Sequence, residues 1–368
     1  MISEPGIRTG TSIYLALAAR LRASIREGRW APGQQIGSEH DLARREGISR
    51  MTVRKASELL VREGLLERRP GKGLFVRGTP GVEGGPVQVV VGNLTWETSL
   101  QMARGVQDAV KGDGIHAQIY DARGDVGLDL RVIESLPVGP ARGAVIVSLH
   151  SPRFSQAISR LHAAGFPFVL LDQKMNDIDV PSITADNHAG GRLVADHLIG
   201  FGHRRIAFLG DLIAGTVRDR LAGLRDALGE ADLPFRPSMV CDLAVVPDNR
   251  FGDWTAEVAA GVRRLMAEPT PPTAIFCSCD GVARRAYREL AALGLRVPDD
   301  VSVVGFDDDP IADYVHPRLT SVRQPFHEMG VAAMDLLRRR IATPAEPPPS
   351  LTLPVQLIER DSVAKPRH

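Results

Sequence analysis

Apolar residues near the N-terminus recur at the spacing of an α-helix. Four aliphatic residues follow one another at four-residue intervals, and they are Ile13, Leu17, Leu21 and Ile25. Because residues four apart lie on one face of a helix, this pattern predicts a helix over residues 11–28 with a buried apolar stripe. Beyond position 86 the apolar residues gather in short continuous runs, which are typical of buried strands. The chain is therefore expected to join a small helical domain to a larger α/β part.

Two short helices joined by a tight turn are predicted next, between positions 39 and 63. Ser38 and Asp41 stand three positions apart, as in a capping pair that begins a helix, and Gly47 is placed to end that helix in a left-handed conformation. Ser49 is positioned to cap the second helix. The buried face of this second helix is predicted to carry Val53, Ala56 and Leu60. This arrangement is that of a helix-turn-helix.

A β-hairpin is predicted after the second helix, which should end at Gly64. Residues 65–69 and 74–76 form its strands, and the turn between them reads Pro-Gly-Lys-Gly. Glycine has no Cβ, so the backbone at Gly71 and Gly73 can approach a partner closely. Lys72, with Arg68 or Arg69, would reach along phosphates or into a minor groove. The hairpin is therefore interpreted as a wing.

Charge is distributed unevenly along the chain. The formal net charge is +1, yet residues 1–78 hold 15 Lys and Arg against 8 Asp and Glu, whereas the remainder holds 30 against 36. The exposed edge of the second predicted helix carries Arg50, Thr52 and Arg54. Arginine reads guanine edges in a major groove, and hydroxyl groups hold phosphates. A double-stranded DNA partner is therefore expected for the N-terminal domain alone.

Residues 14–76 resemble the winged helix-turn-helix domain of the GntR family of bacterial regulators. The residues that carry the resemblance are Tyr14-Leu15, Ala31-Pro32-Gly33, Ser38-Glu39-His40-Asp41-Leu42-Ala43, Gly47-Ile48-Ser49-Arg50-Met51-Thr52-Val53-Arg54, Glu63-Gly64-Leu65-Leu66 and Gly71-Lys72-Gly73. Two departures stand out, because His40 replaces the usual Arg and Gly37 replaces the usual Pro. The candidate DNA-contacting residues are Ser38, Glu39, His40, Arg45, Ser49, Arg50, Thr52, Arg54, Arg69, Gly71 and Lys72.

The part beyond the N-terminal domain is predicted to be an α/β fold of parallel sheets. A linker rich in Gly and Pro over residues 78–86 separates the DNA-binding domain, residues 1–77, from residues 87–368. Strands are predicted at 87–91, 115–120, 143–147, 168–171, 205–209, 239–241, 274–277 and 301–305. Helices are predicted near 99–112, 125–136, 155–164, 187–200, 218–231, 255–266 and 282–293. Strands that alternate with helices indicate βαβ units.

The alternating elements fall into two series, which predicts two lobes with a cleft between them. The first lobe is expected to comprise about residues 87–184 and 324–345, and the second about residues 185–323 and 346–361. In such folds, ligands bind beyond the carboxyl ends of the parallel strands.

Residues 87–360 resemble the sugar-binding domain of the LacI family, which shares its fold with periplasmic binding proteins. The residues that carry the resemblance are Asp186-Asn187, Gly190-Gly191, His197-Leu198, the run 202–210, Arg220, Gly223, the run 252–256, Asp280, Gly294-Leu295, Val297-Pro298, the run 300–308, Leu319-Thr320-Ser321-Val322 and Gln324. The resemblance implies a sugar or sugar derivative as effector, and dimers formed along the sides of the lobes, with residues 98–110 as a candidate surface.

The candidate ligand-binding residues combine aromatic rings with polar groups that bond hydroxyls. Trp254 follows the loop Asn-Arg-Phe-Gly-Asp, and an indole there can stack on the C–H face of a sugar. Partners for sugar hydroxyls are implied by the resemblance at Asp172, Arg220, Asp307, Gln324 and a residue within 93–96. The full candidate set is Asn93, Trp96, Asp172, Arg220, Trp254, Cys279, Asp307, Gln324 and Phe326.

Position 279 departs from the LacI pattern. Cys279 stands where Asn is common, so an effector without a hydroxyl there, or one that is bulkier or less polar, is expected. Asp280 is interpreted as the N-cap of the helix that follows. The run Asp307-Asp308-Asp309 lies on one loop without a second contributing segment, so no metal site is predicted.

No enzyme motif is present. The sequence has no Gly-x-Ser-x-Gly elbow, P-loop or His-Glu-x-x-His, and no cofactor is expected. GntR domains also occur fused to aminotransferase-like modules, but Lys111, Lys174 and Lys365, the lysines beyond the N-terminal domain, do not fit a Schiff-base loop. His197 and His203 are interpreted as packing or capping residues rather than catalysts.

Two further features bear on location and partners. The sequence has neither a run of eighteen apolar residues nor a signal-peptide pattern, so a cytoplasmic protein with no membrane partner is expected. Cys241, Cys277 and Cys279 lack a zinc spacing and are interpreted as structural thiols. The sequence therefore predicts a homodimeric transcriptional repressor controlled by a sugar. The alternative is a sugar receptor or carbohydrate-processing protein whose basic N-terminus serves as an interaction module.

Overall fold

The computed structural model divides the chain into two compact units. The first is formed mainly by the residues up to Pro86, and the second by most of the chain from Val87 onward. The structure describes residues 13–26, 29–30, 33–63, 65–69, 71–76, 85–112, 114–148, 153–175, 178–243, 254–343 and 350–367. The predicted helix end at Gly64, Pro70 of the predicted turn, residues 78–84 of the predicted linker and the loop before Trp254 lie outside these residues.

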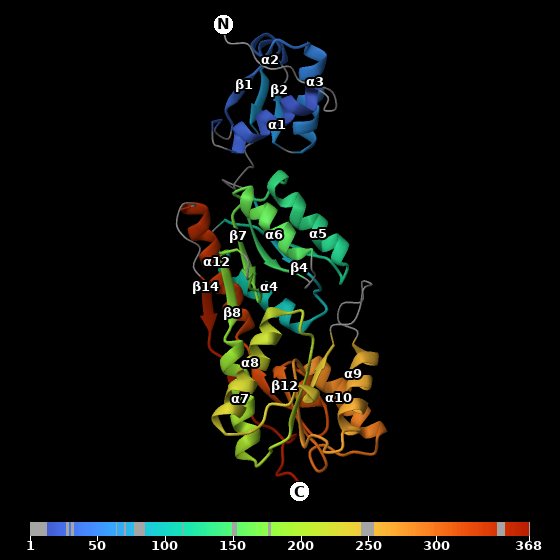
Figure 1. Cartoon of the computed structure of the whole chain (residues 1–368). Helices are drawn as coiled ribbons and strands as arrows, with labels where there is room; N and C mark the ends of the chain where they lie inside the picture. The colour runs from blue at the N-terminus through green and yellow to red at the C-terminus, as the bar shows by residue number, and fades with distance from the viewer. Residues whose placement is uncertain are drawn as a thin grey trace. The chain divides into compact units, whose positions relative to one another are not determined.

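The N-terminal unit packs three helices against a small antiparallel sheet (Figure 1). Its elements are α1 (Ile13–Arg26), β1 (Gln35–Gly37), α2 (Glu39–Glu46), α3 (Arg50–Arg62), β2 (Leu66–Arg69) and β3 (Gly73–Val76). The strand order is β1-β3-β2. The predicted hairpin therefore consists of β3, the central strand, and β2, an outer strand. Strand β1 was not predicted, because three residues are too few to show an alternating pattern.

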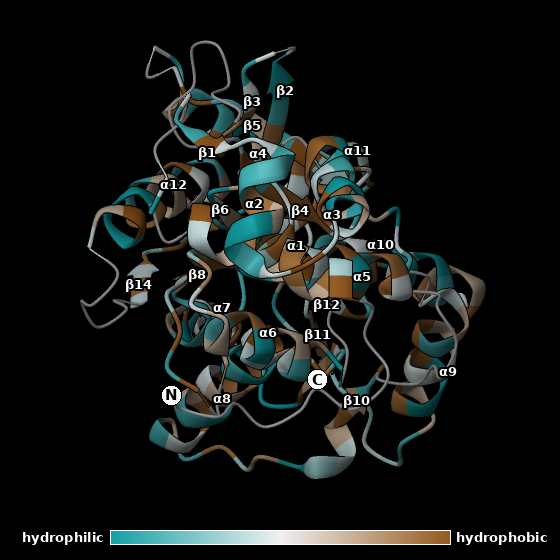
Figure 2. Ribbon diagram, turned by 90° about the horizontal axis from the view of Figure 1, so that it is seen from above, coloured by the Kyte–Doolittle hydropathy of each residue, from teal (hydrophilic) through white to brown (hydrophobic). Residues whose placement is uncertain are grey.

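The apolar stripe of α1 and the inner face of α3 form the core of this unit. Leu17 and Leu21 are buried together with Val53, Ala56 and Leu60. The prediction was wrong for Ile13, which is 59% exposed because it is the first residue of α1 and lies beyond the packed turns. Figure 2 shows the outward surface of α2 as largely hydrophilic, in keeping with a helix that buries only Leu42 and Ala43.

The predicted caps of the helix-turn-helix are confirmed. The Ser38 hydroxyl accepts a hydrogen bond from Asp41 N, and the Asp41 carboxylate accepts one from Ser38 N. Gly47 is left-handed with φ 67°, and the Ser49 hydroxyl accepts from Thr52 N at 3.1 Å. Such caps satisfy backbone groups that a helix end would otherwise leave without partners, so they fix where α2 ends and α3 begins.

The second unit contains two six-stranded sheets, one for each lobe. The first-lobe sheet has the order β14-β8-β7-β6-β4-β5 and is parallel throughout. Its elements are β4 (Val87–Val91), α4 (Glu97–Ala109), β5 (Ala117–Asp121), α5 (Val126–Ser135), β6 (Gly143–Val147), α6 (Phe154–Ala163), β7 (Phe168–Leu171), β8 (Ser182–Ala185), α12 (Phe326–Ala342) and β14 (Ser350–Leu353).

The second-lobe sheet has the order β10-β9-β11-β12-β13-β15 and is parallel except for the pair β13 and β15. Its elements are α7 (Asn187–Gly200), β9 (Ile206–Gly210), α8 (Gly215–Glu230), β10 (Val240–Asp242), α9 (Thr255–Met266), β11 (Ala274–Cys277), α10 (Asp280–Ala292), β12 (Ser302–Asp307), α11 (Ile311–Tyr314), β13 (Thr320–Arg323) and β15 (Gln356–Ile358).

The lobe boundary near the C-terminus differs from the prediction. Residues 350–353 were assigned to the second lobe, but β14 pairs with β8 at the edge of the first-lobe sheet. The chain then returns to the second lobe, where β15 pairs with β13. An exposed edge strand has little apolar periodicity, so the sequence pattern could not assign it.

Glycines allow close contact between the helices that flank the site. On α8, a Cβ at Gly223 would lie 2.1 Å from the His188 carbonyl oxygen of α7. On α7, a Cβ at Gly191 would lie 2.0 Å from the Arg220 carbonyl oxygen. Only glycine permits this close approach of the two backbones, so Gly191 and Gly223 set how α8, which carries Arg220, packs against α7.

Candidate functional site

A cavity of about 580 Å³ lies where the carboxyl ends of the strands of both lobes meet. Its walls include the ends of β6 and β7 from the first lobe and those of β9, β11 and β12 from the second. The predicted binding residues that line it are Trp96, Asp172, Arg220, Trp254, Cys279, Asp307 and Phe326. The cavity therefore occupies the predicted position between the two sheets.

Arg220 is the central cation of this pocket. It is 4% exposed, its Nε donates to Asn187 Oδ1 at 2.8 Å, and its Nη1 donates to the Ser278 carbonyl oxygen. Its Nη1 also lies 3.9 Å from Asp307 Oδ1, and its guanidinium lies 3.8 Å from the centre of the Phe306 ring. These contacts hold the side chain in one conformation, so it is preorganised to bond a ligand.

Asp172 and Asp307 are the acids nearest to Arg220, one on each lobe. Asp172 follows β7 and Asp307 ends β12, and both have left-handed backbones, with φ 58° and 109°. Such conformations cost energy in residues other than glycine and often occur at binding sites. Burial raises the pKa of Asp172 to about 6 and that of Asp307 to about 7, although Arg220 opposes both shifts.

Two predicted ligand residues do not line the pocket. Asn93 Oδ1 accepts hydrogen bonds from Thr95 N and the Thr95 hydroxyl, so its side chain closes the turn before α4. Gln324 Nε2 donates to Asp307 Oδ1 at 2.7 Å from a neighbouring cavity, so Gln324 positions the acid rather than facing the ligand. Direct ligand contact by these two residues stays a prediction, and residue type alone does not show to which side of a loop an amide points.

Several polar residues of the pocket were not predicted. Gln173 is 4% exposed, and its Nε2 donates to the Ser148 carbonyl oxygen at 2.6 Å. Further lining residues outside the predicted set include Glu97, Ser148, Asp211, Thr216, Ser278, Arg284, Arg285 and Asp309. A general signal was available in the sequence. Ser148, Asp211 and Ser278 directly follow buried strands at the edge where ligands bind, and Gln173 stands two residues after one.

The aromatic walls and Cys279 complete the pocket. Trp96 and Trp254 precede α4 and α9, and Phe326 begins α12. Burial and the nearby Asp307 raise the pKa of the Cys279 thiol to about 12, so it stays protonated and offers only a weak donor. Cys241 and Cys277 are buried in the core.

Asp280 is buried but does not cap a helix with its side chain. The N-cap of α10 is Cys279, and Asp280 is the first residue of the helix. The Asp280 carboxylate accepts hydrogen bonds from Asp309 N at 2.8 Å and from the Ser321 hydroxyl at 2.6 Å. The predicted cap is therefore wrong, and Asp280 instead fixes the loop after β12.

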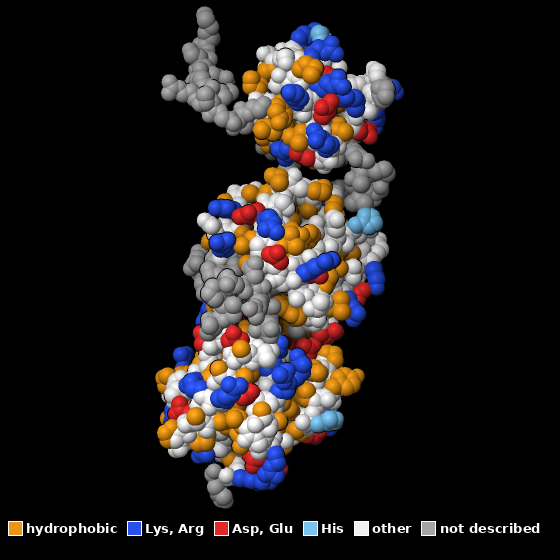
Figure 3. All heavy atoms as spheres, turned by 90° about the vertical axis from the view of Figure 1, so that its right-hand side faces the viewer, with side chains coloured by type: hydrophobic (Ala, Val, Ile, Leu, Met, Phe, Trp, Pro, Cys, Tyr) orange, Lys and Arg blue, Asp and Glu red, His pale blue; other side chains and the backbone are white. Residues whose placement is uncertain are grey.

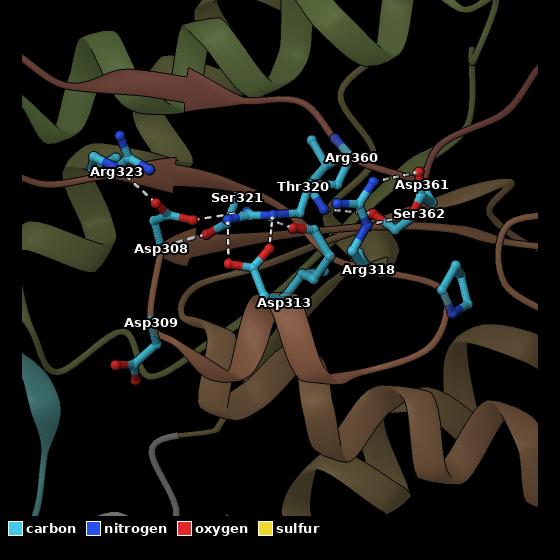
Figure 4. A network of polar contacts seen from close by, with 12 residues as sticks. Asp308, Asp309, Asp313, Arg318, Thr320, Ser321, Arg323, Arg360, Asp361 and Ser362 are labelled. Atoms are coloured by element: carbon cyan, nitrogen blue, oxygen red, sulfur yellow. Dashed lines mark hydrogen bonds and ion pairs between the residues drawn. The ribbon is translucent and has the colours of Figure 1, made fainter.

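Asp308 points away from the pocket into a network of ion pairs, which Figure 4 shows. Its carboxylate lies 2.7 Å from Arg323 Nε and 2.7 Å from Arg360 Nη1, and Arg360 also pairs with Asp313. Asp309, by contrast, points away from this network. The three consecutive acids thus have different partners, and no group of His, Cys, Asp and Glu suited to a metal ion occurs in the described part of the chain.

His197 lies in α7 and His203 follows that helix, and both pack inside the second lobe. The ring of His203 contacts the Thr273 hydroxyl at 2.8 Å and the Ser302 hydroxyl at 3.1 Å, and burial lowers its pKa to about 4. The ring of His197 packs against that of Phe201, with the ring centroids 4.9 Å apart and the planes tilted by 51°. Neither residue lines the pocket, which agrees with their interpretation as packing residues.

The N-terminal unit presents its candidate DNA contacts on an outward surface. Arg50 and Arg54 are exposed on the first turns of α3, and Arg54 Nε lies 3.0 Å from Glu58 Oε1. Met51, 61% exposed between Arg50 and Thr52, adds an apolar side chain to this surface. Figure 3 shows Lys and Arg side chains gathered on this unit. His40, Arg45 and Lys72 are exposed as well.

Ion pairs inside the unit orient the wing and α2. Glu39 Oε1 accepts from Arg68 Nη2 at 2.5 Å, so these two side chains tie α2 to β2. Arg69 lies over the Phe75 ring, 4.4 Å from its centre, and pairs with Glu67. Gly71 is left-handed with φ 71°, which leaves Lys72 at the tip of the hairpin turn.

Two family models match the chain. The model of bacterial regulatory proteins, gntR family, matches residues 13–76, and that of a periplasmic binding protein-like domain matches residues 195–363. The chain is 29% identical to the arabinose metabolism transcriptional repressor of Geobacillus stearothermophilus, over 89% of this chain and 91% of that protein. It is 32% identical to the ribose operon repressor of Haemophilus influenzae, over 55% of this chain and 58% of that protein.

Solved structures agree with these matches. The complex of the transcriptional regulator CelR with cellobiose superposes with a TM-score of 0.67, at 26% identity over 89% of this chain and 99% of that one. The chain joins a GntR-type helix-turn-helix domain to a LacI-type periplasmic-binding-protein-like domain. In the GntR-type domain, Gly37 has φ 121°, which a proline cannot adopt, so the departure at this position changes the backbone before α2. Among the described helices of both domains, none is long and apolar enough to cross a membrane.

Proposed function

We propose that this protein is a transcriptional repressor whose binding to operator DNA is controlled by a sugar or sugar derivative bound in the pocket between its lobes. The observation that carries the proposal is the coexistence of two sites in one chain. One is a capped helix with an exposed, cationic first turn, and the other is a buried pocket that combines indoles with acids and an arginine. The first suits a major groove and the second suits a polyol.

On the DNA side, α3 would enter the major groove with its first turn. Arg50, Thr52 and Arg54 would contact bases or phosphates, while Ser38, Glu39, His40, Arg45 and Ser49 would position the domain. Arg69, Gly71 and Lys72 of the wing would follow the neighbouring backbone. Glu39 already holds Arg68, so its role would be to orient the wing rather than to contact DNA.

On the effector side, the ligand would bond groups from both lobes and so favour the closed cleft. Asp172 belongs to the first lobe, and Arg220 and Asp307 to the second. One ion pair already joins the lobes beside these residues, because Lys174 Nζ lies 3.1 Å from Asp219 Oδ2. Ligand would shift the equilibrium between open and closed lobes by its difference in affinity for the two states.

The protein would act as a homodimer in the cytoplasm. It would have no catalytic activity and would need no cofactor. The relatives from Geobacillus stearothermophilus and Haemophilus influenzae are repressors. A two-fold dimer would present two GntR-type domains to a palindromic operator. On α4, Gly105 faces α12 closely, since a Cβ there would lie 2.0 Å from the His327 carbonyl oxygen. A dimer surface at residues 98–110 would therefore use the opposite face of α4.

The test is duplex binding by the full chain as a function of salt. A regulator should select a defined sequence from a pool of random duplexes. Its affinity should then fall steeply with salt, because each phosphate contact releases counterions. A sugar receptor or carbohydrate-processing protein with a basic interaction module would select no sequence. Failure to enrich any sequence at low salt would contradict the proposal.

A further inference from the structure

One end of the pocket brings together carboxylates from the two lobes. Glu97 is the first residue of α4 in the first lobe, and Asp309 follows β12 in the second. Both line the cavity. Burial raises the pKa of Asp309, and the negative charges of Glu97 and Asp308 raise it further. Two carboxylates, one from each lobe, therefore line the same cavity, where like charges disfavour each other.

The cations that line the cavity are Arg220, Arg284 and Arg285, of which Arg284 is exposed. Within the described part of the chain, neither Glu97 nor Asp309 forms an ion pair. Glu97 accepts one hydrogen bond, from Gln101 Nε2 at 3.2 Å on its own helix. Among the pocket arginines, Arg220 is held by Asn187 and Ser278, and Arg285 donates to Thr255 and to the Gly281 carbonyl oxygen.

Two other side chains of the pocket have buried oxygen atoms that accept no hydrogen bond from the protein. Gln173 is 4% exposed, and although its amide nitrogen is bonded to Ser148, its Oε1 has no hydrogen-bond partner. Asp172 Oδ1 is likewise buried without a hydrogen-bond partner. Buried acceptors of this kind are costly unless a ligand supplies donors. The pocket therefore favours a ligand that is rich in N–H and O–H groups.

We propose that the effector carries a protonated amino group, which lies between Glu97 and Asp309 and holds the two lobes together. The proposal rests on the proposed function, and it narrows the effector to amino sugars and close analogues. An ammonium group donates charge-assisted hydrogen bonds to both carboxylates and removes their repulsion, which a hydroxyl group cannot do. The indoles of Trp96 and Trp254 then contact the apolar face of the ring.

Matched sets of sugars test this assignment on the full chain. Each hexosamine or pentosamine is compared by calorimetry at pH 7 with its parent sugar and its N-acetyl derivative, which are both neutral. At least one free amine is expected to bind roughly 10- to 100-fold more tightly than its two neutral counterparts, the gain of a charge-assisted contact. Amines that bind no more tightly than their neutral counterparts would overturn the proposal.

Variants of the two acids test whether the amino group of the ligand binds between them. Glu97→Gln and Asp309→Asn should each lower affinity for the free amine about tenfold or more and leave affinity for the neutral sugars unchanged or raised. Asp226→Asn, an exposed change on α8 outside the pocket, is the matched control and should alter neither. Equal amine binding by Glu97→Gln and the parent chain would overturn the proposal. A neutral sugar that binds best and changes operator affinity would overturn it too, but would leave the proposed function standing.

Discussion

The N-terminal unit and the effector pocket hold their functional side chains in opposite ways. In the N-terminal unit, Arg50 and Lys72 are exposed on a helix turn and a hairpin tip. In the pocket, Arg220 is buried and bonded on several sides, and the acids around it have raised pKa values. DNA is a large polyanion that can be gripped at a surface, whereas a small polar ligand must be enclosed and have its hydroxyls satisfied.

This difference has a consequence for mutations. A change at the exposed DNA surface should alter one contact and leave the fold intact. A change in the pocket or its support should affect packing, charge balance and binding together, because these groups share partners. The following variants test the contrast.

The broadest effect, on stability and on ligand binding together, is expected for Gly223→Ala in the helix that carries Arg220. The new Cβ would lie 2.1 Å from the His188 carbonyl oxygen, so α7 and α8 must separate. We expect the second unit to lose about 2–3 kcal/mol of unfolding free energy and its ligand response. Thermal unfolding measures the loss. Gly229→Ala on the same helix meets no atom within 4 Å and should be neutral or slightly stabilising. Equal melting temperatures for the two variants would contradict the packing account.

Arg220→Met should remove effector binding and spare DNA binding without effector. The substitution leaves Asp307 and Asp172 buried without their shared cation, and truncating one partner of such a pair costs about 2–5 kcal/mol, at least 30-fold in affinity. Calorimetry with the identified effector measures it. Arg225→Ala, exposed on the same helix, is the control. Undiminished effector binding by Arg220→Met would remove Arg220 from the site.

Arg50→Ala should weaken binding to the selected operator by roughly 10- to 100-fold, the usual cost of losing a base contact. Binding to random duplex should change much less, because that binding depends on phosphates. Fluorescence anisotropy with both duplexes separates the two effects. Arg62→Ala, at the far end of α3, should change neither. An equal loss on both duplexes would show that Arg50 contacts only the DNA backbone.

Lys72→Ala should have the smallest effect. A single phosphate contact at the wing tip would be lost, so the slope of log affinity against log salt should decrease by about one, without a change of preferred sequence. Lys111→Ala, on the effector unit, should leave the slope unchanged. A changed sequence preference in Lys72→Ala would mean that the wing reads bases.

The sequence predicted most of the regular structure, because buried parallel strands read as continuous aliphatic runs. The bounds of β4, β6, β7 and β11 are those predicted, and so are those of α7 and α9. Helix α12 and strands β8, β13, β14 and β15 were not predicted. The helix was missed although its buried residues, such as Met329, Ala333 and Leu337, recur at helical spacing. The edge strand β14, by contrast, has an exposed pattern that no apolar period marks.

The site was predicted unevenly for a similar reason. The candidate DNA-binding surface depends on helix caps formed by Ser38 and Ser49, and such caps are visible in the local sequence. The pocket is assembled from segments far apart in the chain. The sequence therefore could not show that Gln324 bonds Asp307 or that Glu97 and Asp309 line one cavity.

The central claim is that the pocket controls the DNA-binding surface. The most direct measurement is the dissociation constant of the full chain for its selected operator, at fixed salt, with and without saturating effector. We predict a change of roughly 5- to 150-fold, the usual range of allosteric coupling, and no change in Arg220→Met. An operator affinity that stays constant while calorimetry shows the pocket to be filled would contradict the account.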